Sequence, residues 1–382
     1  MIQNLLNPLF SWIDEKSRNK YYPFYLAIFA VTVSWFFACP RFLLLDVASE
    51  AWKTTLLKSQ DLTNSLTHLY PGTGYAKKVF RLTVPFFMKI ANLSPLMVII
   101  IQGFIGPIML FFSYKFSLRI LKDSISATFL TLSLAFLYWG RVAYFDINFT
   151  WFDTFAYFFL LLAMYSNHVL LIFIFSLLAA WTDERAFIAL IIVFIYHHTK
   201  CKLYKKLNYR DLFDFNKSGM SVILAGILYL ATRSFLSYKF NMHTSSEGAT
   251  ILYLKKSFHY IFIGMWTFLE GFWIIYLIAI WHILKNKNHI ALFCFLIPVL
   301  LITLVAGCVT DITRSGSYLV PILFIVIHYM KEYISNNEFR IVLFACFLTT
   351  FLFPAVYICA EIPLKESITS PSLYYLFTRI LN

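Results

Sequence analysis

Three charged residues, Asp183, Glu184 and Arg185, stand side by side in the stretch WTDERAFIAL, between two runs that are otherwise apolar. A carboxylate in such a place can accept a proton as a general base, and an arginine can stabilise an anion through its planar fork of N–H groups. The alternative is a solvated turn with a local pair between Glu184 and Arg185. The triplet by itself favours neither interpretation.

Two further short stretches combine acids with arginine. GRVAYFDINFTWFD contains Arg141, Asp146 and Asp153, and VTDITRSGSY contains Asp311 and Arg314. In the second stretch the acid and the base are three residues apart, so a helical turn would place them on one face. Each stretch alone could be an anchor at a membrane surface. Together with the first triplet, they predict the rim of a polar cavity.

The elements that must position these residues are unusually apolar. The chain of 382 residues is 60% hydrophobic and 20% aromatic, and only 13% of its residues are charged. This composition excludes an ordinary soluble globular protein and indicates a polytopic membrane protein. Runs rich in Phe, Leu and Ile without strict alternation favour helices over barrel strands, so the predicted fold class is an all-α transmembrane bundle.

We expect about eleven transmembrane helices, because a span needs about 17–25 apolar residues and such runs recur along the chain. The expected ranges are 23–45, 94–113, 124–144, 150–167, 168–182, 187–199, 218–233, 259–281, 289–308, 318–330 and 340–359. The whole chain, 1–382, is expected to be a single integral membrane domain. Its two notable connections are a long first outer loop at 46–93 and a basic cytoplasmic loop at 200–217.

Basic residues near the helix ends set the orientation. With the N-terminus in the cytoplasm, the inner segments carry basic clusters such as KCKLYKKLNYRDLFDFNK, and the short outer loops carry one arginine each. We therefore expect a cytoplasmic N-terminus. Acidic residues then gather on the outer side, which topology does not explain, so chemistry or ion handling is expected there. The net charge of +13 suits loops facing anionic membrane lipid, and nothing resembles a nucleic-acid module.

The longest outer connection, 46–93, opens with Asp46 directly after the first helix and continues with Glu50, His68 and Arg81. Its stretch VFRLTVPFFMKIA is too short and too interrupted to span a bilayer, so we expect amphipathic helices that lie along the membrane. A loop this long and apolar should pack on the bundle, and such loops often carry function.

These features resemble the GT-C superfamily of polytopic glycosyltransferases. The similar features are an acid after the first helix, an outer loop of interfacial helices, a histidine followed by the R-x-x-x-P element of Arg81 and Pro85, and many helices with short loops. The resemblance covers the layout of the whole chain. The stretch LLLDVASE lacks the DxD or double-acid pairs of some branches, which leaves open whether a divalent metal, Mg²⁺ or Mn²⁺, takes part.

The resemblance implies transfer of a sugar from a polyprenyl-phosphate-linked donor to a glycan or lipid-linked acceptor on the outer face. Such a reaction needs a general base for the acceptor hydroxyl and cations for the departing phosphate. The candidate bases are Asp46, Asp146 and Asp183. The candidate phosphate-binding residues are Arg81, Arg314, His68 and Arg185. The other polar residues expected along the cavity are Glu50, Asp153, Glu184, Glu270 and Asp311.

Plainer roles stay open for three of these residues. Asp46 could be a helix-end residue at the interface, and His68 could simply pack within its loop. Glu270 falls near the middle of an apolar stretch, MWTFLEGFWII, where an acid is by default a functional hypothesis. It could line the cavity or form a hydrogen bond inside the bundle.

Two other functions stay open as well. An O-antigen or exopolysaccharide polymerase also acts on polyprenyl-linked sugars at the outer face, but large Arg-rich outer loops distinguish that class. A transporter or flippase of lipid-linked saccharides predicts inverted repeats and broken helices. The sequence shows no internal symmetry, although QGFIGPIML could break the second helix. In each case the expected location is a bacterial cytoplasmic (inner) membrane.

Overall fold

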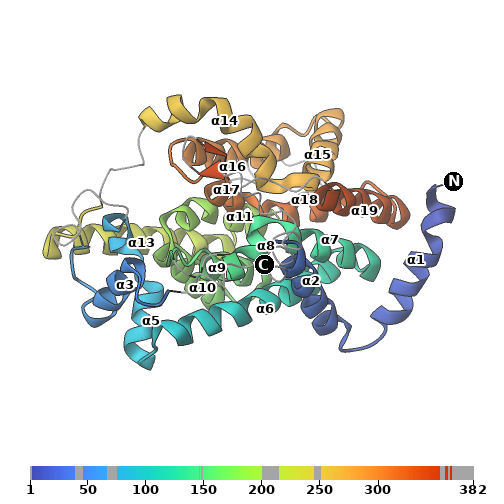
Figure 1. The fold of residues 1–382 in the computed structure, drawn as a ribbon. Coiled ribbons are helices and arrows are strands. Elements are labelled where there is room, and N and C mark those ends of the chain that lie inside the picture. The colour runs from blue at the N-terminus through green and yellow to red at the C-terminus, as the bar shows by residue number, and fades with distance from the viewer. Residues whose placement is uncertain are drawn as a thin grey trace.

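The computed structural model describes residues 2–38, 46–66, 75–145, 147, 149–199, 215–244, 251–352, 358–359 and 362–363. These residues form an almost wholly helical bundle (Figure 1). The α-helices are α1 (Ile2–Ser17), α2 (Tyr22–Ala38), α3 (Glu50–Gln60), α5 (Thr83–Ala91), α6 (Pro95–Leu121), α7 (Ser124–Phe136), α8 (Tyr138–Phe145), α9 (Asp153–Tyr165), α10 (Val169–Thr182), α11 (Glu184–Thr199), α13 (Lys217–Phe240), α14 (Ile251–Leu269), α15 (Trp273–Lys285), α16 (His289–Gly307), α17 (Ile312–Gly316), α18 (Ile322–Met330) and α19 (Asn336–Leu352). The other described elements are the 3-10 turns η2 (Ala76–Phe80), η3 (Glu270–Phe272) and η4 (Ser317–Leu319), and an antiparallel pair of two-residue strands, β1 (Ile358–Cys359) and β2 (Ile362–Pro363).

Five helical segments in the described part of the chain are long and apolar enough to cross a membrane. They are Pro95–Leu121, Lys217–Phe240, Tyr260–Lys285, His289–Gly307 and Ile312–Met330. A sixth is added if α7 and α8, which are bent by 57°, count as one span. The predicted helical, multi-pass membrane architecture is therefore confirmed, whereas the number of eleven spans stays a prediction.

Two helices expected to be continuous are interrupted. The range 124–144 divides into α7 and α8 because Leu137 between them is extended, with φ −66° and ψ 155°. The range 259–281 contains the 3-10 turn η3 at Glu270, whose φ of 46° is left-handed, within the apolar segment Tyr260–Lys285. Thr350 of α19 accepts a hydrogen bond from the backbone N–H of Gly271 at 3.1 Å, so a neighbouring helix satisfies a donor that the turn releases.

The described parts of segment 46–93, which the sequence predicts to be the first outer loop, fold back onto the bundle as short helices, α3, η2 and α5. The indole of Trp52 in α3 is buried and donates a hydrogen bond to the backbone oxygen of Ile147, 3.1 Å away. At the start of α5, the N–H of Leu82 donates to the backbone oxygen of Trp181 at 2.8 Å. These contacts fix the loop at the ends of α8 and α10, where the charged stretches lie. In Figure 1, α3 and α5 lie at the opposite end of the molecule from α1.

Candidate functional site

A buried network of ion pairs lies where the first outer loop meets the bundle. Asp183 closes α10, and its carboxylate accepts hydrogen bonds from Nε and Nη2 of Arg185 at 2.7 and 2.6 Å. The same carboxylate is 3.1 Å from Nη2 of Arg81, which belongs to the first outer loop. Asp183 is fully buried, and Arg185, Arg81 and Arg314 all lie within 4 Å of its carboxylate.

Asp153, the first residue of α9, joins the other two charged stretches to this network. It is also fully buried. Its carboxylate accepts hydrogen bonds from Nη2 of Arg185 at 3.1 Å and from Nε of Arg314. The hydroxyl of Tyr318 donates a third, at 2.7 Å. Three segments far apart in the sequence therefore meet on one carboxylate.

Two less buried acids complete the network. Asp311 accepts a hydrogen bond from Nη1 of Arg314 at 3.0 Å, so the acid and base three residues apart do share a helical face, as the sequence predicts. Glu184 accepts one from Nη2 of Arg81 at 3.0 Å, with 38% of its side chain exposed. The predicted alternative of a solvated turn with a local Glu184–Arg185 pair is wrong, because Arg185 is buried and binds Asp183.

The surrounding arginines decide the protonation of Asp183. Burial alone would raise the pKa of its carboxyl group, but Arg185, Arg81 and Arg314 outweigh that effect and hold the pKa below its ordinary value. A carboxylate held in this way is a weak proton acceptor. Its structural effect is to fix the positions of the arginines.

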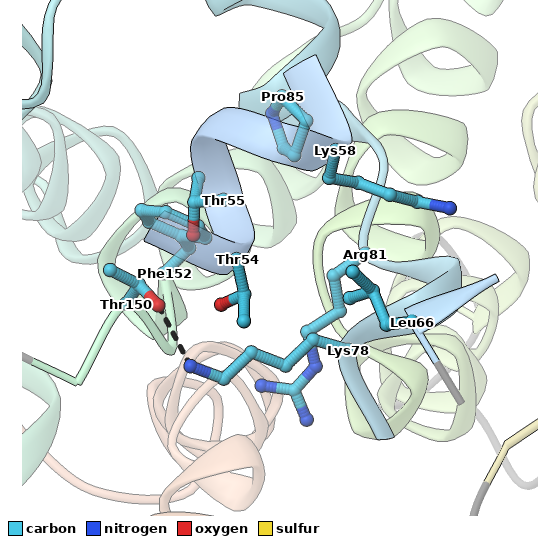
Figure 2. A pocket seen from close by; sticks show the side chains of 9 residues that line it. All are labelled: Thr54, Thr55, Lys58, Leu66, Lys78, Arg81, Pro85, Thr150 and Phe152. Carbon is cyan, nitrogen blue, oxygen red and sulfur yellow. Dashed lines mark hydrogen bonds between the residues drawn. The ribbon is translucent and has the colours of Figure 1, made fainter. Parts of the chain in front are cut away.

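A tight pocket of about 10 Å³ adjoins the network, and Arg81 belongs to both (Figure 2). Its lining contains three cationic side chains, three threonine hydroxyls and no carboxylate. The lining residues are Thr54, Thr55, Lys58, Leu66, Lys78, Arg81, Pro85, Thr150 and Phe152. They come from α3, the first outer loop and the connection between α8 and α9. The lining therefore carries a net positive charge that attracts anions.

Lys58 is the most buried cation of the pocket, with 1% of its surface exposed. Its ammonium group donates a hydrogen bond to the backbone oxygen of Asn64 at 2.6 Å. Burial lowers the pKa of Lys58 to about 8, and the charge of nearby Asp61 offsets only part of this effect. A buried ammonium with so little compensation favours the binding of an anion beside it.

The other two cations also present donors to the pocket. The ammonium of Lys78 donates a hydrogen bond to the hydroxyl of Thr150 at 2.7 Å and another to the backbone oxygen of Phe149. Figure 2 shows Lys78 reaching toward Thr150, with the guanidinium of Arg81 beside it. Nε of Arg81 is buried and has no hydrogen-bond partner within the described structure, which is rare for a buried donor.

The backbone beside the pocket is strained. Thr150 and Phe152 have φ values of 51° and 61°, in the left-handed region that residues with a side chain rarely adopt. A β-branched residue such as Thr150 is especially unfavourable there. Strain of this kind costs about 1–3 kcal/mol per residue and gathers at functional sites.

The remaining predicted site residues are more scattered. Asp46 is exposed and accepts a hydrogen bond from the N–H of Ala48 at 2.9 Å, in the turn before α3. Glu50 is exposed and pairs with Lys53 at 2.6 Å. Glu270 is buried in the bundle, 3.9 Å from Arg141. His68 and Asp146 lie outside the described residues. The catalytic and phosphate-binding roles assigned to these side chains stay predictions.

Sequence reasoning missed Lys58, Lys78 and Thr150. One signal could have indicated Lys58, because Thr54 lies four residues before it and both would face the same side of a helix. Nothing in the sequence indicates that this side is covered, since the cover comes from the loop after α3 and from the α8–α9 connection.

No three His, Cys, Asp or Glu side chains within the described ranges converge as a metal site would. Comparison of the chain with known protein families, with curated proteins and with solved structures finds no match.

Proposed function

We propose that this chain is a membrane glycosyltransferase that moves a sugar from a polyprenyl-phosphate-linked donor to a glycan or lipid-linked acceptor. The observation that carries the proposal is the pocket of Lys58, Lys78 and Arg81, with its three threonine hydroxyls and no lining carboxylate. The oxygens of a phosphate accept hydrogen bonds, and negative charge grows on them as the bond to the sugar breaks. The three cations of the pocket supply the charge that such a group needs, whereas the threonine hydroxyls donate to the backbone oxygen of Ala51.

The proposed transfer balances as a substitution at the anomeric carbon. The acceptor hydroxyl oxygen attacks that carbon, the bond from the carbon to the phosphate oxygen breaks, and its electron pair leaves with the phosphate. A carboxylate takes the proton of the acceptor. Asp46 is the first candidate, because it is exposed and leads into α3, the helix that carries Lys58. Asp146 stays a candidate on sequence grounds, and Asp183 is less suited because of its low pKa.

The ion network has a supporting part in this proposal. Arg81 is held by Asp183 and Glu184, so its guanidinium is in place before a ligand arrives. Preorganised donors stabilise a developing charge without a reorganisation cost. Arg185 has its donors on Asp183, Asp153 and Ser315 and acts as a positioning residue. The proposal places the protein in a bacterial cytoplasmic membrane, with the N-terminus inside and the pocket on the outer side.

The test uses binding and product analysis together. Purified protein in lipid nanodiscs is titrated with a short-chain polyprenyl phosphate, comparing Lys58→Met with Lys53→Met. Lys53 lies on the same helix but is 56% exposed and paired with Glu50, so its replacement is the matched control. We expect Lys58→Met to weaken binding by about tenfold or more and Lys53→Met to leave it unchanged. Equal affinity in the two variants would refute the pocket assignment.

The product arm distinguishes the transferase from the polymerase. Lipid-linked and surface glycans are compared by mass spectrometry in cells that make the intact protein or Lys58→Met. Loss of one sugar from the glycan supports a transferase. Loss of chain length with an unchanged repeat unit supports the polymerase instead.

A flippase is the second candidate, and the interrupted helices favour it. The 57° bend between α7 and α8 resembles the broken helices of transporters, and the Arg141–Glu270 pair is buried in the bundle. A flippase would move a lipid-linked saccharide across a vesicle membrane without forming a new glycosidic bond. Reconstituted protein with a fluorescent lipid-linked sugar distinguishes the two activities.

A further inference from the structure

Phe149, Trp151 and Arg314 form a three-layer stack beside the pocket. The rings of Phe149 and Trp151 are nearly parallel, with centroids 4.7 Å apart and an angle of 13° between their planes. The guanidinium carbon of Arg314 lies 4.0 Å from the centroid of the Trp151 ring. Two groups at these separations cannot share one ring face, so Trp151 lies between Arg314 and Phe149.

The open end of this stack is the ring of Phe149. Phe149 is 42% exposed, whereas Trp151 is only partly exposed because both of its faces are covered. Arg314 anchors the inner end through its ion pairs with Asp153 and Asp311. The exposed ring is therefore a flat apolar surface on a rigid support.

The strained backbone separates this stack from the pocket. Thr150 and Phe152, the residues with left-handed φ, line the pocket, whereas Phe149 and Trp151 alternate with them and form the stack. Residues 149–152 thus alternate between the aromatic stack and the lining of the pocket. The strained φ values occur at the two residues that line the pocket.

The stack also lies close to a cation of the pocket. The ammonium of Lys78 donates its hydrogen bonds to the backbone oxygen of Phe149 itself and to the neighbouring hydroxyl of Thr150. One ligand of the size of a sugar phosphate can therefore reach both the aromatic ring and the ammonium.

We propose that Phe149 is a sugar-binding platform, on which the flat C–H face of a pyranose stacks while the phosphate of the same molecule lies at Lys78 and Arg81. This inference rests on the proposed function and adds to it a subsite for the transferred sugar. A pyranose has an apolar face and a polar rim, and an exposed aromatic ring buries the apolar face while leaving the rim free for hydrogen bonds.

The other reading of an exposed aromatic ring in a membrane protein is an anchor at the membrane–water interface. Anchors are typically tryptophan and tyrosine, whose polar edge reaches the headgroups. Here the tryptophan is covered on both faces and the exposed ring is a phenylalanine without a polar edge. An anchor also requires neither a stack with a buried arginine nor a cation at its own carbonyl, and both are present.

The test probes the sugar without phosphate or lipid. Saturation-transfer NMR on the full chain in nanodiscs uses the methyl pyranosides of glucose, galactose, mannose and N-acetylglucosamine. We expect the ring protons of one face of at least one of them to receive saturation. Phe149→Ala should reduce the signal about fivefold or more, and Phe149→Tyr should retain it. The thermal stability of each variant is measured alongside, so that a folding defect is detected independently.

Separate outcomes identify which proposal fails. No saturation of any pyranoside by the intact protein, or equal saturation by the intact protein and a folded Phe149→Ala, would overturn the platform. Loss of pyranoside binding in Phe149→Ala with polyprenyl phosphate binding intact supports it. If polyprenyl phosphate fails to bind while pyranosides still depend on Phe149, the phosphate pocket fails and the platform stands. A change in membrane partitioning alone in Phe149→Ala would make the ring an anchor.

Discussion

Arg185 binds Asp183, two residues before it, through two hydrogen bonds, Nε to Oδ1 at 2.7 Å and Nη2 to Oδ2 at 2.6 Å. The second carboxylate oxygen of Asp183 also lies 3.1 Å from Nη2 of Arg81. A short turn between two helices thus holds the guanidinium that lines the pocket. Buried arginine–carboxylate pairs depend on both partners, because the loss of one leaves the other charged and desolvated.

Replacing Asp153 should destabilise the protein strongly. Asp153→Asn removes the charge that compensates Arg185 and Arg314, and the side chain is fully buried. The expected loss is about 3–5 kcal/mol, the range measured when one partner of a buried ion pair is removed. This loss of stability is measured by thermal unfolding in nanodiscs, with ligand binding or aggregation as the signal for unfolding.

Glu184→Gln is the matched control for this prediction. Its side chain is 38% exposed and contacts Arg81, which keeps its pair with Asp183. The expected cost is below about 1 kcal/mol, because solvent screens a partly exposed pair. If both variants unfold at the same temperature, the network does not contribute the stability inferred here.

The affinity for a phosphate ligand should fall as the pH rises through about 8. Burial lowers the pKa of Lys58 to about 8, and a bound anion favours the charged ammonium. Below that pH Lys58 is already charged, so binding is at full strength. Above it, binding must also protonate the amine, which weakens affinity by up to about tenfold per pH unit until the higher pKa of the complex is reached.

Titrations with polyprenyl phosphate between about pH 7 and pH 9.5 check this dependence, because the phosphate monoester is largely doubly ionised there. Lys58→Arg is the control, since a guanidinium stays charged over the whole interval. Its affinity should be nearly flat with pH. A decline of the same size in Lys58→Arg would assign the titration to another group.

Replacing Gly106 in α6 should destabilise the protein. A Cβ at Gly106 would collide with the hydroxyl end of Tyr144 in α8, whose oxygen donates a hydrogen bond to the backbone oxygen of Gly103 at 3.0 Å. Gly106→Ala is expected to cost about 1–3 kcal/mol through overpacking. A Cβ at Gly103 meets nothing within 4 Å, so Gly103→Ala should be neutral or slightly stabilising. The thermal unfolding temperatures of Gly106→Ala and Gly103→Ala check this expectation. Equal unfolding temperatures would contradict the close packing of Tyr144 on Gly106.

Labelling of single cysteines tests the orientation. In a cysteine-free background, Glu15→Cys in α1 and Lys53→Cys in α3 place thiols at positions where the native side chains are 71% and 56% exposed. We expect a membrane-impermeant maleimide to label position 53 in intact cells and position 15 only after permeabilisation. Labelling of both positions from the same side would overturn the assignment of the pocket to the outer face.

The sequence predicts part of the site because its charged stretches are local patterns. An acid and an arginine recur in three short segments between apolar runs, and the structure brings Asp153, Asp183 and Arg314 together from them. The pair of Arg141 with Glu270 was not predicted, since it joins distant helices and neither sequence context indicates the partner. The burial of Lys58 likewise depends on how a loop folds back, which periodicity does not encode.

The helix pattern shows the same limit. Apolar runs predict where helices begin: α6, α13 and α16 start within one residue of the expected ranges 94–113, 218–233 and 289–308. Only α16 also ends within one residue of its range, because α6 and α13 continue to Leu121 and Phe240. The interruption at Leu137 is not marked by proline and follows from tertiary packing. Gly140 lets the start of α8 close against the end of α7, because a Cβ there would collide with the backbone oxygen of Leu134.

The shortness of α9 and α10 sets the depth of the charged centre. With 13 and 14 residues, these helices are each about 20 Å long, whereas the hydrocarbon core of a bilayer is about 30 Å thick. Asp153 begins the first helix and Asp183 follows the second, at the same end of the pair. If their other ends reach the opposite interface, the carboxylates lie about 10 Å beneath the lipid headgroups. In the proposed transfer, an acceptor from the aqueous phase must then enter the protein to this depth to reach the donor. A lipid-linked donor can reach the same depth laterally from the bilayer.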